Sequence, residues 1–264
     1  MQKITNSRFF SLLKKSRLGA ASICTSIVIW QLIAEFIVKD AFILPSFSDV
    51  ALAFFLMSWR EMLLDISISL LHFGMGLIAG ICVGVPIGAT MGWFRVVDSL
   101  LDPLVEIVRP IPPLSWIPFA IIWFGLAHSS AGFIVFIGVI FPILINSYAG
   151  FRDVRKVHVE AAKVLGCTRD YDLMRSIAFP SAMPSIATGI RVGMGVGWMC
   201  LAAAEIFGRS SGLGYKLWHF YELHQIDNVV AYMILLGLIG LFLNNAFRYL
   251  VEERILRWQK GVIF

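Results

Sequence analysis

The sequence predicts an all-α protein that crosses a membrane with six helices. Of its 264 residues, 58% are hydrophobic and only 15% are charged, and its mean hydropathy of +0.80 excludes an ordinary soluble domain. Several apolar runs of about 20 residues are each long enough to cross a hydrocarbon core of roughly 30 Å. Positive charge collects in alternate connecting segments, which is the pattern that sets the orientation of a membrane protein.

The six spans are separated by turn signals and by changes in charge. An amino-terminal tail is expected over residues 1–18, a transmembrane region over 19–250 and a carboxy-terminal tail over 251–264. A cytoplasmic loop at residues 151–183 joins the fourth span to the fifth. The expected spans are approximately 19–38, 63–93, 103–124, 131–150, 184–207 and 229–247.

The distribution of positive charge places both termini in the cytoplasm. The four segments expected inside hold five, one, six and four Lys or Arg residues in chain order. The net charge of +5 therefore follows from membrane orientation and does not indicate a nucleic-acid partner. The positive residues of the segments expected outside are Lys39, Arg60, Arg209 and Lys216.

The second span has a glycine at every fourth position over five positions. Glycine at this spacing removes side chains from one ridge of a helix and allows another helix to approach closely. We therefore expect this ridge to pack against a neighbouring span. Its members are Gly76, Gly80, Gly84, Gly88 and Gly92.

The third span contains a proline-rich stretch. Four prolines fall within residues 110–118, so no uninterrupted helix can run through them. The backbone groups freed by the break must be buried in protein or must line water. Glu106 and Arg109, three residues apart, are placed to pair and so to offset the cost of two charges in the bilayer.

A charged stretch between the fourth and fifth spans is the most distinctive part of the chain. Residues 152–175 hold six Lys or Arg residues between long apolar runs. Residues 160–165 favour a helix, and Gly166 is well suited to its left-handed C-terminal cap. Thr168 is placed to cap a second short helix. The prolines expected to end this helix–Gly–helix elbow before the fifth span are Pro180 and Pro184.

This elbow resembles the EAA loop of ABC importer permeases. In that family Glu-Ala-Ala, a glycine four residues after the second alanine, and a later Ile-x-Leu-Pro recur. The chain departs from the pattern in two ways, since Phe179 replaces the leucine and the spacing from Gly166 to Pro180 is one residue longer. The matching residues here are Glu160-Ala161-Ala162, Gly166 and Ile177-Ala178-Phe179-Pro180.

Further segments are similar to signatures of one permease subfamily, which serves importers of nitrate, taurine and other sulfonates. These segments are residues 43–46, 109–118, 123–125 and 210–215, and their order and spacing match over about residues 43–258. The resemblance implies a type I ABC importer permease fold in the bacterial inner membrane. It also implies a small, anionic solute; bicarbonate, an aromatic acid or a thiamine precursor are the alternatives.

The resemblance also implies partners. These are a second copy of the chain, two ATPase subunits at the cytoplasmic face and a soluble or lipid-anchored solute-binding protein outside. The chain lacks a Gly-x4-Gly-Lys-Ser/Thr phosphate loop, so ATP and Mg²⁺ are expected on the ATPase and no cofactor or catalytic role is expected here. The residues expected to couple to the ATPase are Glu160, Ala161, Ala162, Gly166 and Thr168.

The fifth span carries two different faces. Gly189, Gly193 and Gly197 form a smooth face suited to helix packing. The opposite stripe begins with an arginine roughly 10 Å inside the helix, which is too costly to face lipid, so the stripe is predicted to line the translocation path. The alternative is that the arginine reaches the cytoplasmic surface and Glu205 lies at the outer interface. The residues of the stripe are Arg191, Gly195, Trp198, Ala202 and Glu205.

Two other function classes compete with an ABC permease. An integral-membrane enzyme would use Glu106, Arg109, Glu205 and a histidine, but no nucleophile–base or metal-ligand spacing supports it. A self-powered secondary transporter is the third class, and the sequence shows no internal repeat of the kind that such folds often have.

Overall fold

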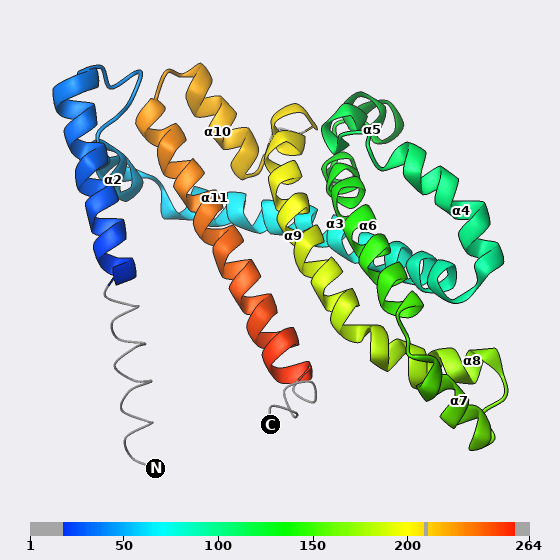
Figure 1. Cartoon of the computed structure of the whole chain (residues 1–264). Helices are drawn as coiled ribbons and strands as arrows, with labels where there is room; N and C mark the ends of the chain where they lie inside the picture. The colour runs from blue at the N-terminus through cyan, green and yellow to red at the C-terminus, as the bar shows by residue number, and fades with distance from the viewer. Residues whose placement is uncertain (1–17, 209–210, 257–264) are drawn as a thin grey trace, which may run out of the picture. The chain divides into compact units, whose positions relative to one another are not determined.

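The computed structural model describes residues 18–208 and 211–256, and all regular elements in these ranges are helices (Figure 1). Five helices are long and apolar enough to cross a membrane, or six if the bent helix pair is counted as one span. The all-α, polytopic fold class is thus confirmed. Most of the predicted amino-terminal tail, part of the carboxy-terminal tail, and residues 209–210 of the predicted outer turn lie outside the described residues.

The chain forms two compact units, Met1–Ser58 with Leu217–Ile234 and Trp59–Lys216 with Leu235–Phe264. In the first unit, the Leu18–Val38 helix ends in the π-helical segment η1 (Ile33–Val38) and is followed by α2 (Phe47–Leu56). A capping box starts α2. The Ser46 hydroxyl accepts from the Asp49 backbone N–H at 3.2 Å, and the Asp49 carboxylate accepts from the Ser46 N–H at 3.3 Å.

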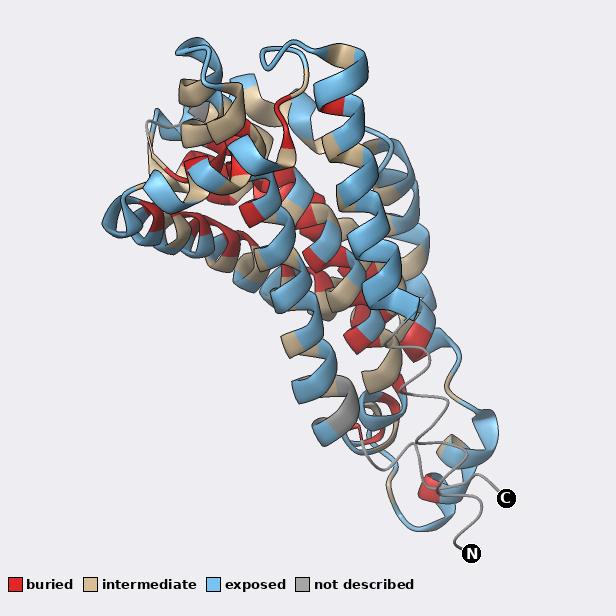
Figure 2. Ribbon diagram, turned by 90° about the vertical axis from the view of Figure 1, so that its left-hand side faces the viewer, coloured by how far each residue is buried: buried red, intermediate tan, exposed pale blue. Residues whose placement is uncertain are grey.

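The second unit is built on three long helices, α3 (Trp59–Trp93), α6 (His128–Arg152) and α9 (Phe179–Gly208). α6 makes its most extensive contacts with α3 and α9, which also touch each other. Their apolar side chains form one core cluster that includes Phe73, Val139 and Leu201. Figure 2 shows the buried residues recurring along one side of the helices, as expected for helices that turn the other side outward.

The glycine ridge of α3 packs against α6, which confirms the prediction. A Cβ atom on Gly76 would lie 2.5 Å from Cβ of Val135, and one on Gly84 would lie 3.1 Å from the Ile140 carbonyl oxygen. The predicted smooth face of α9 also meets α6, since a Cβ on Gly197 would lie 2.5 Å from Val139 Cγ2. The glycines of α3 and α9 therefore allow the backbones of these two helices to lie close to α6, each against a different face of α6.

The proline-rich stretch breaks the third span, as predicted. The helix α4 (Arg95–Val108) is followed by η2 (Pro113–Trp116) and α5 (Ile117–Phe124), with a bend of 88°. The predicted pairing of Glu106 with Arg109 is wrong. Both side chains are exposed and, within the part of the chain that the structure describes, no ion pair joins them. With neither group buried, a low-dielectric environment does not force them together.

The elbow continues into α9 without the expected interruption. The order is α7 (Lys156–Val164), α8 (Asp170–Leu173), the π-helical η3 (Met174–Ala178) and then α9, so the prediction that two prolines break the chain is wrong. Pro180 lies in the first turn of α9, directly after η3, and its i−4 carbonyl belongs to Ser176, where the hydrogen bonding is π-helical. Pro184 lies inside α9, where it removes one backbone N–H from the helix.

The last helices of the described chain are α10, α11 and η4. α10 (Leu213–Glu222) follows the outer turn, and α11 (Ile226–Phe247) continues into the π-helical η4 (Arg248–Ile255). In the second unit, α11 reaches α9 through the Leu236 carbonyl, which accepts a hydrogen bond from Trp198 Nε1 at 3.0 Å. The carboxy-terminal part of α11 adds Leu243 to the core cluster.

The packing of α3 on α6 yields a testable expectation. Gly84→Leu should destabilise the protein by about 1–3 kcal/mol, because its side chain would meet the backbone of α6. The measurement is the fraction of monodisperse protein left after heating in detergent. Gly74→Leu is the matched control, since a Cβ at Gly74 meets nothing within 4 Å. Equal loss in the two variants would contradict the packing interpretation.

Candidate functional site

The elbow turns at a glycine-capped helix end. Gly166 has a φ of +94°, which L side chains rarely adopt. The Gly166 N–H donates to the Lys163 carbonyl at 3.0 Å, and the Cys167 N–H donates to the Ala162 carbonyl at 3.0 Å. These two bonds define a Schellman motif with glycine at the left-handed position. The predicted glycine cap is confirmed.

The second elbow helix begins differently from the prediction. Arg169 is the N-cap of α8, and no side chain caps it, so the expectation that Thr168 caps this helix is wrong. Thr168 lies one residue too early for its hydroxyl to reach the first turn. The first turn instead carries Asp170 and Asp172, whose negative charge is favourable at the positive end of the helix dipole.

The elbow presents apolar side chains outward. Val164 and Leu165 are both 87% exposed at the end of α7, whereas Ala162 is buried. The predicted coupling residues Glu160 and Ala161 lie on α7 and are exposed. A shallow pocket of about 360 Å³ lies between α7 and the start of α9, lined by His158, Ala161, Ala162, Leu165, Ser176, Ile177, Pro180 and Ser181. This surface is suited to receive an apolar segment of another protein.

Four of the five residues predicted to line a path are at least partly accessible on α9. A Cβ on Gly195 would meet nothing within 4 Å, and Arg191, Trp198 and Ala202 are partly buried. Beside them a cavity of about 170 Å³ opens between α3, α9 and α11. Its lining includes Phe73, Gly195, Trp198, Leu243 and Asn244. The ring of Phe73 meets Trp198 edge to face at 5.3 Å, so the wall of this cavity is aromatic.

Glu205, the fifth residue of the stripe, is wholly buried. Its Oε1 lies 2.8 Å from Nδ1 of His72, and its Oε2 accepts from the Ser69 hydroxyl at 2.9 Å and from the Gly214 N–H at 2.8 Å. The other ring nitrogen of His72 lies 2.7 Å from Nδ1 of His128. A buried carboxylate is costly, and these hydrogen bonds offset that cost.

The backbone at Gly212 packs directly against the carboxylate of Glu205. Gly212 has a φ of +108°, and a Cβ there would lie 2.5 Å from the Glu205 carboxyl group. The Leu213 N–H donates to the Ser69 hydroxyl at 2.9 Å, so two N–H groups at the start of α10 are satisfied by this cluster.

The spacing of polar residues on the second predicted span is the feature of the sequence that indicates this buried cluster. Asp65, Ser69 and His72 are spaced by four and three residues on an apolar span, and all three are buried on α3. Polar side chains at that spacing share one helix face and are expensive in a membrane unless they meet partners. The partner of Ser69 and His72 is Glu205, which is 133 residues beyond His72, and the spacing within one helix does not reveal it.

Of the residues proposed for an enzyme site, Glu205 meets a histidine, His72, but Glu106 and Arg109 do not join them. Glu106 and Arg109 are exposed near the end of α4, whereas Glu205 is enclosed by α3, α9 and the start of α10. Among the described residues, no group of three His, Cys, Asp or Glu side chains is arranged to hold a metal ion. The described part of the chain thus offers no arrangement of these groups for catalysis.

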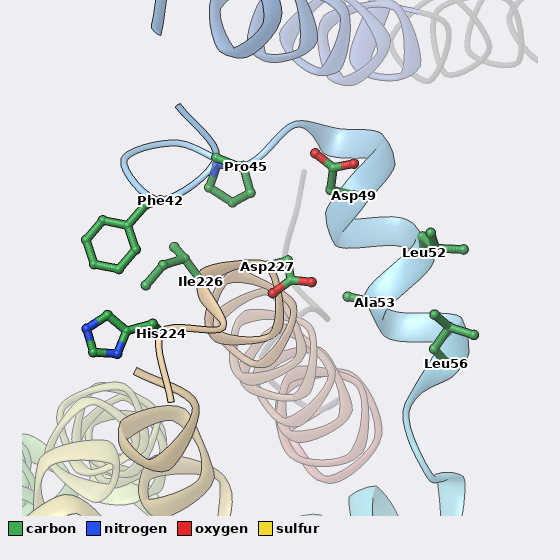
Figure 3. A pocket seen from close by; sticks show the side chains of 10 residues that line it. Phe42, Pro45, Asp49, Leu52, Ala53, Leu56, His224, Ile226 and Asp227 are labelled. Carbon is green, nitrogen blue, oxygen red and sulfur yellow. The ribbon is translucent and has the colours of Figure 1, made fainter. Parts of the chain in front are cut away.

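A separate pocket of about 320 Å³ lies within the first unit (Figure 3). Phe42 stacks on His224 with ring centroids 5.5 Å apart, and Figure 3 shows Asp49 on α2 and Asp227 at the start of α11 as its charged side chains. His224 has a φ of 58°, which is uncommon outside glycine. None of the predicted site residues lines this pocket.

Comparison with known proteins gives a consistent result. The family described as "binding-protein-dependent transport system inner membrane component" matches residues 76–256. A putative ABC transporter permease protein of Methanocaldococcus jannaschii is 40% identical over 89% of this chain and 89% of its own length. The taurine transport system permease protein of Escherichia coli is 34% identical over 74% of this chain and 70% of its own length. A putative aliphatic sulfonates transport permease protein of Bacillus subtilis is 32% identical, with coverages of 89% and 85%.

The two faces of α9 should differ in their reaction with water-soluble thiol reagents. With the native cysteines replaced, Gly195→Cys and Ala202→Cys should react, because both positions are accessible on the predicted stripe. Leu201→Cys should not react, because Leu201 is 0% exposed. Equal rates at all three positions would remove the path assignment.

Proposed function

Because the chain belongs to the family of binding-protein-dependent transport system inner membrane components, we propose that it forms the translocation path of an ABC importer for a small anion. The chain is a multi-pass protein of the bacterial inner membrane and a non-catalytic permease subunit. Its family works with a solute-binding protein and an ATPase. The family match over residues 76–256, which includes both the elbow and the α9 stripe, is the observation that carries the proposal.

The elbow is the proposed contact with the ATPase. Two of its apolar side chains, Val164 and Leu165, are exposed beside the rigid turn at Gly166, so the ATPase would cover a surface that is otherwise unfavourable in water. ATP and Mg²⁺ bind to the ATPase subunits in this proposal, and this chain holds no cofactor. The proposed contact residues remain Glu160, Ala161, Ala162, Gly166 and Thr168.

We place two copies of the chain in the complex, with both termini in the cytoplasm. The charge asymmetry between alternate connecting segments supports this orientation. Apolar side chains of α4 are exposed in the single chain, which supports a lipid or protein neighbour at this helix. These side chains are Val96, Leu100, Leu104 and Ile107. Copurification of the tagged chain should recover a second, untagged copy together with the ATPase.

The proposed solute is a sulfonate or taurine. Two of the similar proteins are named for taurine and aliphatic sulfonates, and the predicted stripe carries Arg191 on its cytoplasmic half. Nitrate, bicarbonate, an aromatic acid or a thiamine precursor remain the alternatives. Uptake of each labelled compound by the complete complex in proteoliposomes distinguishes them. Arg191→Ala should reduce anion uptake at least tenfold more than Arg191→Lys, which keeps the charge.

The cap of α7 gives a direct test of coupling. Gly166→Val should reduce ATPase binding or ATP-driven uptake, because a β-branched residue resists the left-handed conformation by about 1–2 kcal/mol. Gly166→Asn should retain much of the activity, because asparagine tolerates this conformation better than other side chains. The measurements are ATPase copurification and ATP hydrolysis per mole of solute taken up.

A matched control distinguishes backbone strain within the elbow from backbone strain elsewhere in the chain. Gly125 also has a positive φ, +69°, and open space around it, but it lies away from the elbow. Gly125→Val should therefore leave ATPase copurification intact even if the protein is less stable. Normal coupling in Gly166→Val, with normal amounts of protein in the membrane, would refute the assignment of the elbow.

A further inference from the structure

The buried position of Glu205 conflicts with its place on an otherwise accessible stripe. The next residue of the stripe towards the cytoplasm, Ala202, is partly exposed, whereas Glu205 is 0% exposed. The difference arises from residues 212–214, which we call the gate segment. A Cβ on Gly212 would meet the Glu205 carboxyl group, and a Cβ on Gly214 would meet the backbone of Ala202. The gate segment therefore lies directly on the end of the stripe.

We propose that Ser69, His72 and Glu205 are positioning residues of an outer gate, which hold the gate segment over the end of the translocation path. Release of the gate segment would expose Glu205 and make the stripe continuous from Arg191 to Glu205. This inference rests on the proposed function, since a gate at this place requires that α9 line the path. We call these three side chains the latch.

In the latch, each hydrogen-bond donor is matched by an acceptor. The Ser69 hydroxyl accepts the Leu213 N–H, which leaves its own proton to donate to Glu205. Glu205 Oε2 also accepts the Gly214 N–H. The backbone N–H groups of two consecutive residues, 213 and 214, thus donate to two side chains, Ser69 on α3 and Glu205 on α9. Separation of α3 from α9 at this end would break these bonds together.

His72 connects the latch to α6. One of its ring nitrogens lies 2.8 Å from Glu205 Oε1 and the other lies 2.7 Å from Nδ1 of His128, in the first turn of α6. A histidine with both nitrogens engaged is fixed in its ring orientation. The closed gate therefore requires the inner part of α3 that carries Ser69 and His72, the start of α6 and the end of α9 to keep one relative position, and a movement of any of the three releases it.

The close fit explains why the gate can open as a unit. Neither Gly212 nor Gly214 has a side chain that interlocks with α9, so hydrogen bonds, backbone contact and the fully buried side chain of Leu213 hold the segment over the stripe. The nearby pair of Lys216 Nζ and Glu61 Oε2, at 3.0 Å, is partly exposed and so contributes little to closure. The buried latch is the stronger restraint because its charge-assisted hydrogen bonds lie out of water.

The test measures exposure of the gate segment in the complete transport complex. Leu213 is 0% exposed in the gate segment, and Leu223, just after α10, is 52% exposed. With the native cysteines replaced, Leu213→Cys and Leu223→Cys form a buried and an exposed reporter on the same side of the membrane. A membrane-impermeant maleimide added outside should label Leu223→Cys quickly and Leu213→Cys at least tenfold more slowly in the absence of nucleotide.

The latch variants are then examined in the Leu213→Cys background. Glu205→Gln should raise the labelling rate without nucleotide about tenfold or more, because a charge-assisted hydrogen bond to each N–H or O–H donor is lost. In the vanadate-trapped complex, where the gate is expected to be open, the parent and the Glu205→Gln variant should be labelled equally fast. An effect confined to one state distinguishes a latch from a general loss of structure, which would change both states.

Two milder variants keep the test decisive if Glu205→Gln fails to fold. Ser69→Ala removes one hydroxyl without adding volume, and Gly214→Ala pushes the gate segment away from the Ala202 backbone. Both should raise the rate without nucleotide. Gly237→Ala is the matched control and should not, because its Cβ would meet nothing within 4 Å.

The outcomes separate the gate from the proposed function. Rapid labelling of Leu213→Cys in the parent without nucleotide, or unchanged rates in all three latch and gate variants, would overturn the gate while leaving a permease that couples to its ATPase. Failure of the complex to hydrolyse ATP or to take up any tested anion would instead contradict the proposed function, and the labelling rates measured without nucleotide do not depend on that result.

Discussion

The close contact of α6 with both α3 and α9 is the constraint on which the second unit depends. Glycines on α3 and α9 have no Cβ atoms to separate them from Val135, Val139 and the α6 backbone. Within a bilayer, where lipid is as apolar as leucine, this close van der Waals packing is what favours helix association over contact with lipid. The contact also fixes the ends of the three helices, so that polar groups on α3 and α9 meet in a buried cluster.

The parts of the fold that follow from local chemistry could be predicted from the sequence. The four-residue spacing of glycine identified the packed ridge of α3, and Gly166 identified the capped end of α7. Both depend on the steric properties of one residue type within one helix. Thr168 was predicted to cap α8 from the same kind of rule, but the helix begins one residue later than that rule assumed. A shift of one residue is enough to move a hydroxyl out of reach.

Features that depend on distant residues could not be predicted in the same way. Pro180 and Pro184 lie within a continuous helical run instead of ending it, and the π-helical segment η3 directly before α9 changes the hydrogen bonding at Pro180. The environment of Glu205 is set by residues of α3, α6 and the start of α10, and no spacing within α9 contains that information. Periodicity placed Glu205 on the same face of α9 as Gly195 and Ala202, but its burial there depends on the segment that covers it.

The two candidate sites are joined by one helical segment. α8, η3 and α9 form a continuous run, Asp170–Phe207, whose first turns belong to the elbow and whose last turn carries Glu205. A 30-residue helix such as α9 is about 45 Å long and is far stiffer than a loop of equal length. A displacement of the elbow is therefore transmitted along α9 to the latch, unless η3 absorbs it. Because the latch also requires α3 and α6 to keep their positions, a shift of α9 alone is sufficient to break it. In the proposed permease, movement at the elbow would thus open the gate at the other end of α9 without any contact between the two sites.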